Sequence, residues 1–213
     1  MSETVFSTIG IERLRVFQDG EGITTLVAGY GCPLRCRYCL NPQCFVWGKP
    51  VKTYGVYELI DEASVDDLYF QATGGGVVFG GGEPLLQADF IHAFRKSCPP
   101  QWKIYLESSL SVPWKELEKV VDDIDHFLID IKDMDPEIYK NYTGKESATM
   151  IRNLQMLAEM GAQNRVTVRI PLIPGYNTPE SQERSRKRLE KMGFRSFDLF
   201  SYEVEYALNK RKN

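Results

Sequence analysis

Three cysteines within eight residues constrain this chain more than any other feature. Cys32, Cys36 and Cys39 stand at a Cys-x3-Cys-x2-Cys spacing in the segment GCPLRCRYC. Thiolates this close can converge on one metal centre, and an all-thiolate set favours zinc or an iron–sulfur cluster. Three protein ligands would leave one iron of a cubane open, whereas a structural zinc site would need a fourth ligand. Two alternatives stay open on spacing alone: a zinc site completed by Cys44, or buried cysteines without a metal.

Length and composition favour one soluble globular domain. The chain has 213 residues, of which 43% are hydrophobic and 26% charged, and we expect a single domain over residues 1–213 with its core at about 19–203. The net charge of −3 gives no reason to expect binding to nucleic acid or to an acidic membrane surface.

The cysteine count and the N-terminus favour a reducing compartment. No apolar run approaches the roughly 20 residues needed to span a bilayer. The N-terminal segment MSETVFSTIGIERLRVF lacks the apolar core of a signal peptide. We therefore expect a cytoplasmic protein, in which clustered cysteines serve as metal ligands; five cysteines, an odd number, agree with this.

Short apolar strands alternate with helical segments along the chain. Strands are expected over Ile23–Ala28, Val77–Phe79, Trp102–Glu107, His126–Ile131, Arg165–Ile170 and Arg195–Tyr202, with a further short strand and a glycine-rich turn within Ile11–Gly22. Helices are expected over Tyr57–Thr73, Ala88–Cys98, Pro113–Val121, Ser147–Met160 and Pro179–Met192, and an irregular segment over Asn41–Thr53. In the first helix, the inner face is expected to carry Leu59, Ile60, Ala63, Leu68 and Ala72. About six strand–helix units predict an α/β fold with a parallel sheet, and because six are too few to close an eight-stranded barrel, a partial (β/α)6 barrel.

Polar and glycine residues gather at the carboxyl ends of the expected strands. That edge binds ligands in α/β folds of this kind. It is expected to carry the cysteine loop, the glycine run Gly80–Gly82 with Glu83, and the side chains of Glu107, Asp130, Lys132, Arg169, Tyr202 and Glu203. Each has a structural explanation on its own: a tight turn, a strand-end ion pair, an ordinary arginine. Their coincidence at one edge favours a binding site.

Other chemically capable residues are expected to be structural. Cys98 is placed at a helix end, His92 on a helix face and His126 at the start of a strand. The aspartates at 122, 123 and 125 are expected in a solvated turn, and the proline turn RIPLIPGYN is expected to be scaffold. With only two histidines, a histidine-based metal site or catalytic triad has little to build on.

The cysteine loop, with Tyr38 before its last cysteine, resembles the signature of the radical S-adenosylmethionine (SAM) enzymes. The segment Gly81-Gly82-Glu83-Pro84 resembles their "GGE" motif. In the same order, DGEGI (Asp19–Ile23), DIKDMDPEIYKNYTG and RIPLIPGYN resemble the activating enzymes of glycyl-radical enzymes, the group typified by pyruvate formate-lyase activating enzyme. The resemblance extends from about Asp19 to Tyr202.

This resemblance implies an oxidoreductase that binds a [4Fe–4S] cluster through Cys32, Cys36 and Cys39. A flavodoxin or ferredoxin would reduce the cluster under anaerobic conditions, and SAM would be cleaved to methionine and a 5′-deoxyadenosyl radical. The radical would take a hydrogen atom from a backbone glycine of a partner glycyl-radical enzyme, with the chain itself a monomer. The residues implied around SAM are Tyr38, Leu40, Gly81, Gly82, Glu83, Glu107, Ser109, Asp130, Lys132 and Arg169.

The chain departs from the family pattern at two strand ends. Tyr202-Glu203 stands where the family has Tyr-His, and Glu107-Ser108-Ser109-Leu110 stands where it has a T-N-G type turn. There is also no room for the cysteine-rich insert that many activating enzymes carry. Two other hypotheses stay open: a radical SAM enzyme acting on a small molecule or peptide, and a metal-binding interaction protein without catalysis.

Overall fold

The computed structural model of this chain describes residues 4–45 and 52–204. They form two compact units, each built from separate segments of the chain. Of these residues, unit 1 comprises 4–32, 43–45, 52–108 and 113–128, and unit 2 comprises 33–42, 109–112 and 129–204. The single domain expected over residues 1–213 stays a prediction. The basic C-terminal tail and part of the segment expected to be irregular lie outside the described residues.

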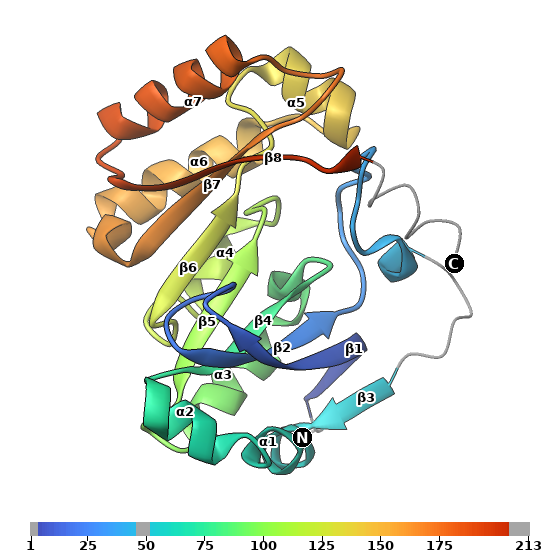
Figure 1. The fold of residues 1–213 in the computed structure, drawn as a ribbon, viewed down its shortest axis with the longest axis vertical. Helices are drawn as coiled ribbons and strands as arrows, with labels where there is room; N and C mark the ends of the chain where they lie inside the picture. Colours follow the sequence, from blue (N-terminus) through green and yellow to red (C-terminus); the bar gives the residue numbers. More distant parts are fainter. Residues whose placement is uncertain (1–3, 46–51, 205–213) are drawn as a thin grey trace. The chain divides into compact units, whose positions relative to one another are not determined.

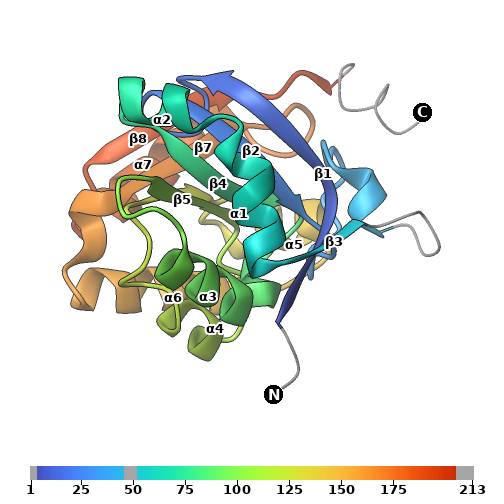
Figure 2. The same ribbon diagram turned by 90° about the horizontal axis from the view of Figure 1, so that it is seen from below.

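Unit 1 contains five neighbouring strands in the order β3-β1-β2-β4-β5 (Figures 1 and 2). Their bounds are β1 Val5–Val16, β2 Ile23–Gly29, β3 Lys52–Gly55, β4 Gly76–Gly81 and β5 Lys103–Ser108. β2, β4 and β5 are parallel, while β1 is antiparallel to β2 and to β3. Gly29 lies beside Gly81 in the register, so the segments that follow β2 and β4 leave the sheet at the same edge.

The N-terminal strands differ from the expectation. A short strand was expected within Ile11–Gly22, but β1 begins at Val5 and has 12 residues. The strand β3 falls in the segment expected to be irregular, and Tyr54 pairs there with Phe6. β1 carries charged, exposed residues and lacks a continuous apolar alternation. Its length is set by pairing partners far away in the sequence, which a local pattern does not reveal.

The single helix expected over Tyr57–Thr73 is wrong, because two helices occupy the segment. α1 (Val56–Ser64) ends before Asp66, and α2 (Asp67–Thr73) begins after it. Asp66 is fully buried and accepts hydrogen bonds from the Arg13 guanidinium (2.8 and 2.6 Å) and the Thr25 hydroxyl (2.7 Å). The break shifts the helical phase, so that Phe70 is buried and Leu68 is 77% exposed.

Replacing Asp66 with asparagine should destabilise the protein by about 2 kcal/mol at neutral pH, because hydrogen bonds to a buried carboxylate are lost. Burial alone would raise the pKa of Asp66, but the hydrogen bonds from Arg13 and Thr25 outweigh it and lower that pKa. The stabilisation from this carboxylate is therefore present above the ordinary pKa of aspartate and is lost as pH falls through the lowered value. Urea unfolding between pH 7 and pH 3 would measure both effects. Asp61→Asn, an exposed change five residues earlier, should alter neither.

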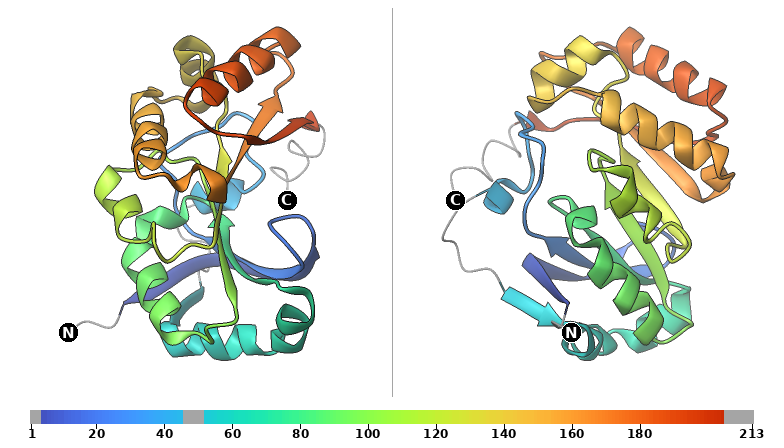
Figure 3. Two further views of the ribbon diagram at one scale, coloured as in Figure 1. Left: turned by 90° about the vertical axis from the view of Figure 1, so that its left-hand side faces the viewer. Right: turned by 180° about the vertical axis from the view of Figure 1, so that it is seen from behind.

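The core of unit 1 is aromatic. α3 (Ala88–Ser97) lies across one face of β4 and β5 (Figures 2 and 3). Phe94 packs edge-on against Phe79 with ring centroids 5.2 Å apart, and Phe70 packs in the same way against Trp102 at 5.3 Å. This unit also contains α4 (Trp114–Glu118), the 3-10 turn η2 (Pro84–Gln87) and all but the first residue of the 3-10 turn η1 (Pro42–Phe45). The helices expected over 88–98 and 113–121 are present, the second shorter than expected.

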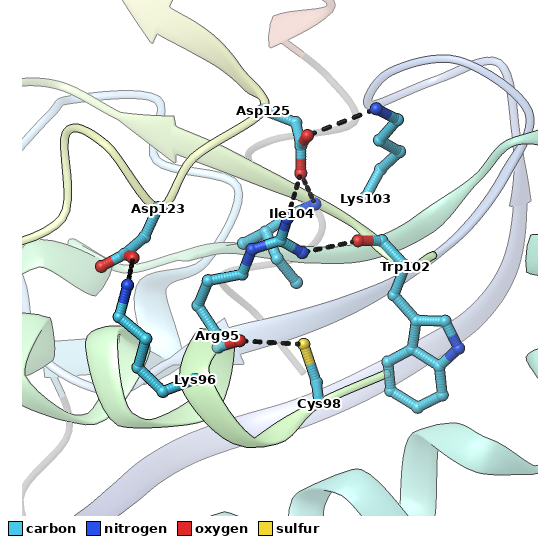
Figure 4. Close-up of polar contacts among 8 residues, drawn as sticks. All are labelled: Arg95, Lys96, Cys98, Trp102, Lys103, Ile104, Asp123 and Asp125. Atoms are coloured by element: carbon cyan, nitrogen blue, oxygen red, sulfur yellow. Dashed lines mark hydrogen bonds and ion pairs between the residues drawn. The ribbon is translucent and has the colours of Figure 1, made fainter. Parts of the chain in front are cut away.

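The solvated turn expected at the aspartates before β6 is wrong for two of the three. Asp123 is buried and accepts hydrogen bonds from Lys96 (2.8 Å) and His92 (2.6 Å). Asp125 accepts from the backbone N–H of Ile104 at 2.8 Å. Figure 4 shows how these carboxylates join α3 to the beginning of β5, where Cys98 also donates to the Arg95 carbonyl (3.6 Å). The polar cluster stands at the amino ends of the strands, and its role is structural.

Unit 2 contains the parallel strands β7 (Val166–Leu172) and β8 (Ser196–Ser201), with α6 (Ala148–Glu159) along one face of β7 (Figure 3). β6 (His126–Asp130) starts in unit 1 and ends in unit 2, where Ile131 N–H donates to the Arg169 carbonyl at 3.2 Å. α7 (Pro179–Lys191) and the turn η3 (Ala162–Arg165) complete the unit with α5 (Pro136–Thr143). α5 was not expected, although Asp135 caps its start and Gly144, at φ 73°, ends it.

The proline turn after β7 is scaffold, as expected. Asn177 accepts a hydrogen bond from Ile173 N–H (2.6 Å) and donates to the buried Asp133 (3.1 Å). Ser185 of α7 donates to the other oxygen of Asp133 at 3.0 Å. Strands and helices alternate through both units, so the expected α/β class is confirmed. Within the described residues, every helix is too short or too polar to cross a membrane.

Candidate functional site

The glycine-rich turn after β4 is bonded to the beginning of the cysteine loop in unit 1. Gly82 N–H donates to the Gly29 carbonyl (3.0 Å), and Glu83 N–H donates to the Gly31 carbonyl (2.8 Å). A Cβ atom at Gly82 would stand 2.2 Å from the Gly31 oxygen and 2.7 Å from the Gly29 oxygen. Only glycine fits there, because the two backbone segments approach so closely.

Two carboxylates stand at the ends of β4 and β5. Glu83 is fully buried, and the Ser108 hydroxyl donates to its Oε1 at 2.7 Å. Leu85 N–H donates to the same oxygen at 3.4 Å. The Glu107 carboxylate lies against Gly80, where an added Cβ would come within 2.6 Å of Oε2. Unit 1 therefore holds Glu83 in one orientation beside the partly exposed backbone of Gly81 and Gly82. Ser108 is a candidate site residue that was not singled out from the sequence.

The middle of the cysteine loop is bonded to the end of α5 in unit 2. Arg35 N–H donates to the Thr143 carbonyl (2.9 Å), and Arg37 N–H donates to the Tyr142 carbonyl (3.1 Å). These two bonds flank Cys36, whose side chain is buried. Burial raises the pKa of the Cys36 thiol to about 11, while the positive charge of Lys132 acts in the opposite direction. The segment Tyr142-Thr143-Gly144 therefore has a structural role. It anchors the cysteine loop through backbone carbonyls at the end of α5 that have no partner within the helix.

Lys132 places a charged amine inside unit 2. Its side chain is 11% exposed, and its Nζ lies 3.5 Å from Oδ2 of Asp130. Burial disfavours the charged form, but the charge of Asp130, followed by Tyr202, Cys36 and Tyr142, raises the pKa of Lys132 well above its ordinary value. The amine therefore stays protonated. The prediction that Asp130 and Lys132 point the same way from a strand end is consistent with this ion pair.

Arg169 is not at the end of its strand as expected, since β7 continues to Leu172. Its Nε lies 3.8 Å from Oδ2 of Asp198 on β8, and its side chain is 17% exposed. The guanidinium is thus mostly buried and already faces a carboxylate.

Four tyrosines pack together in unit 2, and we call Tyr38, Tyr142, Tyr176 and Tyr202 the tyrosine cluster. The Tyr142 ring lies 6.1 Å from Tyr38, 5.1 Å from Tyr176 and 6.5 Å from Tyr202, measured between ring centroids. Of these four, Tyr38 was predicted beside SAM and Tyr202 at the strand-end edge, whereas Tyr142 and Tyr176 were not singled out. Tyr142 stood within a quoted motif, but nothing in the local pattern distinguished its side chain from that of Tyr139, which lies three residues earlier.

The segment after β5 departs from the T-N-G pattern, but its backbone still adopts the left-handed turn in which glycine would normally stand. Leu110 stands at the glycine position of the T-N-G pattern and has a φ of 54°. The Asn153 amide donates to the carbonyls of Leu110 and Val112, each at 2.8 Å. Leu110 is also fully buried, so packing and this clamp offset the strain of a left-handed leucine.

The predicted site residues divide between the two units. Unit 1 contains Cys32, Gly81, Gly82, Glu83 and Glu107, and unit 2 contains Cys36, Tyr38, Cys39, Leu40, Ser109, Asp130, Lys132 and Arg169. Of the residues described, no three His, Cys, Asp or Glu side chains stand together as a metal site in either unit. All five cysteines are free thiols. Cys44 lies buried in η1, outside the loop.

The residues present fit an iron–sulfur cluster and SAM. The donor set is three thiols within eight residues, which is the ligand chemistry of such clusters. The backbone around Gly82 forms a glycine cradle, which is a space that a Cβ atom would fill. This turn lies beside the buried carboxylate of Glu83. In unit 1 the Glu83 carboxylate could pair with a ligand amine, and in unit 2 the charged groups of Lys132 and Arg169 could pair with a ligand carboxylate.

Comparisons with known proteins agree with this chemistry. The family model "Radical SAM superfamily" matches residues 26–183. The chain is 29% identical to the (2S)-3-sulfopropanediol dehydratase activating enzyme of Klebsiella oxytoca over an alignment of 231 positions, which covers 78% of this chain and 71% of that protein. It is 32% identical to the pyruvate formate-lyase-activating enzyme of Staphylococcus aureus over an alignment of 169 positions, which covers 75% of this chain and 65% of that protein.

A solved structure shows the same fold. The crystal structure of Streptococcus suis SuiB bound to S-adenosylmethionine superposes with a TM-score of 0.61 at 15% identity, covering 84% of this chain and 40% of that one. This likeness supports the α/β radical SAM core expected from the sequence. The family model covers most of the chain and includes the cysteine loop, the glycine-rich turn, Lys132 and Arg169. The chain belongs to the radical SAM superfamily.

Proposed function

We propose that this protein activates a glycyl-radical enzyme by removing a hydrogen atom from a backbone glycine of that partner. As a member of its superfamily it is a radical SAM oxidoreductase, and its cofactors are a [4Fe–4S] cluster and SAM. The partner is inferred from the curated relatives, which are named as activating enzymes. When bound, the cluster and SAM supply a 5′-deoxyadenosyl radical; the protein binds, orients and shields them.

The chain's own residues divide this work. Cys32, Cys36 and Cys39 would provide the thiolates for the cluster. The turn Gly81–Glu83 would accept the SAM amino group, and the charged side chains of Asp130, Lys132 and Arg169 would hold the rest of SAM. Tyr38 and Leu40 would lie near the adenine, with Glu107 and Ser109 nearby. No side chain needs to act as a general acid or base.

The observation that carries this proposal is the bonding of one loop to two distant motifs. The beginning of the cysteine loop is bonded to the glycine-rich turn through Gly31 and Glu83. Its middle is bonded to the end of α5 through Arg35 and Arg37. A zinc site closed by Cys44 would not require either arrangement, since neither the glycine cradle nor the buried Lys132 would have a ligand to bind.

We further propose a flavodoxin or ferredoxin as electron donor, a monomeric state and a cytoplasmic location. Free thiols at all five cysteines support a reducing environment. A single radical SAM domain over residues 1–213 is part of the same proposal.

The test is anaerobic reconstitution followed by SAM cleavage. We expect a brown protein with about four irons per chain. With dithionite and SAM it should release 5′-deoxyadenosine, and an added glycyl-radical partner should show a glycyl doublet in EPR. A colourless zinc protein without cleavage would end the enzyme proposal. Cleavage with turnover of a small molecule, and no radical on any protein partner, would favour the alternative substrate class.

Replacing Ser108 with alanine should weaken SAM binding about tenfold, because the buried Glu83 carboxylate would lose the hydrogen bond that fixes its position. Ser108→Thr should restore most of the affinity, since it keeps the hydroxyl. The matched control is Ser185→Ala, which removes a buried serine–carboxylate bond to Asp133 outside the site. That control should lower stability without changing SAM affinity in isothermal titration calorimetry. Equal affinities for Ser108→Ala and the wild type would show that Ser108 does not position Glu83 for binding.

A further inference from the structure

We propose that the phenol of Tyr142 binds the cofactor directly, donating a hydrogen bond to an oxygen atom of SAM. The inference rests on the proposed function, because it takes SAM as the ligand of unit 2. It adds a binding residue beyond those implied by the family motifs.

The first step is the state of the Tyr142 hydroxyl. The side chain is completely buried, and its oxygen makes no hydrogen bond of ordinary geometry to the described residues, although the Tyr202 hydroxyl lies close enough to act as a weak partner. Buried polar groups are paired in nearly all folded proteins, so an unpaired one in a binding region indicates a missing partner. Burial also raises the pKa of Tyr142, with Tyr202 adding to the effect. The phenol therefore remains protonated and can donate.

The second step is that the ring is held in place independently of its hydroxyl. Tyr38, Tyr176 and Tyr202 pack against its edges and face, with interplanar angles of 62°, 73° and 67°. The Tyr142 backbone carbonyl accepts from Arg37 N–H. The hydroxyl is thus presented in a fixed position by packing and by the helix end, and its own bonding is left for another group.

Lys132 provides a second hydrogen-bond donor in the same region. Lys132 is mostly buried, and its contact with Asp130, at 3.5 Å, is too long for a strong hydrogen bond. An ammonium group has three N–H donors. A phenol donor and an ammonium donor in the same region call for a ligand that brings acceptor oxygens. SAM has such atoms in its ribose hydroxyls and its carboxylate.

Tyr139 provides a matched control for Tyr142. Tyr139 lies one turn earlier on α5, is equally buried, and donates to the Ser111 hydroxyl at 3.4 Å. The two tyrosines share a helix, a burial state and a side chain, but in the described part of the chain the Tyr142 phenol, unlike that of Tyr139, makes no hydrogen bond of ordinary geometry. Phenylalanine replaces either ring without creating a cavity.

The experiment measures SAM affinity by calorimetry and thermal stability without SAM, using the full chain reconstituted with its cluster. Tyr142→Phe should raise the dissociation constant about fivefold. It should leave the melting temperature unchanged or higher, because an unpaired buried hydroxyl is removed. Tyr139→Phe should leave SAM affinity unchanged.

Three results would overturn the inference. Equal affinities of wild type and Tyr142→Phe would show that the phenol does not touch SAM. A lower melting temperature of Tyr142→Phe, with no change in affinity, would assign it a structural bond instead, for example to Tyr202. A wild-type protein that binds no SAM would overturn the proposed function and this inference together.

Discussion

Alanine at Cys36 should abolish both the cluster and SAM cleavage. The thiol is buried within unit 2, between the two backbone bonds of Arg35 and Arg37, so no neighbouring group can move in to replace it. We expect the anaerobically reconstituted variant to hold far fewer than about four irons per chain and to release no detectable 5′-deoxyadenosine. Iron analysis, absorbance in the charge-transfer bands of the iron–sulfur cluster and chromatography of the products would measure these changes.

The informative comparison is with the cysteines outside the loop. Cys44→Ala and Cys98→Ala each remove a buried thiol, at 2% and 8% exposure, from positions that the proposed cluster does not use. Both variants should retain the full iron content and normal cleavage. If Cys44→Ala lost the metal as completely as Cys36→Ala, the site would be a closed four-thiolate one and the SAM proposal would fail. If all three variants kept their metal, the loop would not be the metal site.

The parallel strands could be predicted because their signal is local. β2, β4, β5 and β7 each contain several buried apolar residues within a strand of six or seven residues. Motifs that follow such runs fall at the same edge of a parallel sheet. The register of Gly29 beside Gly81 bears out this reasoning for the first two strands.

What the sequence could not show depends on partners far along the chain. The length of β1 follows from its pairing with β3, some 50 residues later. The break between α1 and α2 follows from a carboxylate, Asp66, whose donors lie on β1 and β2. Asp123 and Asp125 looked like a solvated turn, because nothing in their neighbourhood reveals that α3 and β5 supply donors to them. Buried polar groups are specified by tertiary pairing rather than by local pattern.

The candidate site, too, could be predicted only in part from the sequence. The residue types and their spacing indicated which side chains would carry the chemistry. The hydrogen bonds that hold them, from Ser108 to Glu83 and from the cysteine loop to α5, join segments that are separated by 25 residues in one case and by more than a hundred in the other. That the Tyr142 phenol makes no hydrogen bond of ordinary geometry to the described residues follows only from their tertiary arrangement.

Alanine at Gly82 should damage stability and binding together. Its Cβ would meet the carbonyl oxygens of Gly31 and Gly29, which are the acceptors of the two hydrogen bonds that hold the turn. Neither oxygen can withdraw without breaking a bond, so we expect a loss of about 3 kcal/mol in unfolding free energy. Because Gly31 directly precedes Cys32, the displacement should also move a predicted cluster ligand. SAM affinity should fall at least about tenfold.

Urea unfolding, iron content and calorimetry with SAM would measure the effects of Gly82→Ala side by side. The control is Gly161→Ala, at the end of α6, where φ is 73° but no atom lies within 4 Å of the added Cβ. It should cost only the strain of a left-handed alanine, about 1 kcal/mol, with iron and SAM binding intact. If Gly82→Ala lost no more stability than this control and still bound SAM normally, the turn would have to tolerate a side chain. The close approach of the two backbones would then not be what shapes the site. The opposite result would show that the glycine-rich turn and the cysteine loop work as one bonded element, in which a change in either motif disturbs the other.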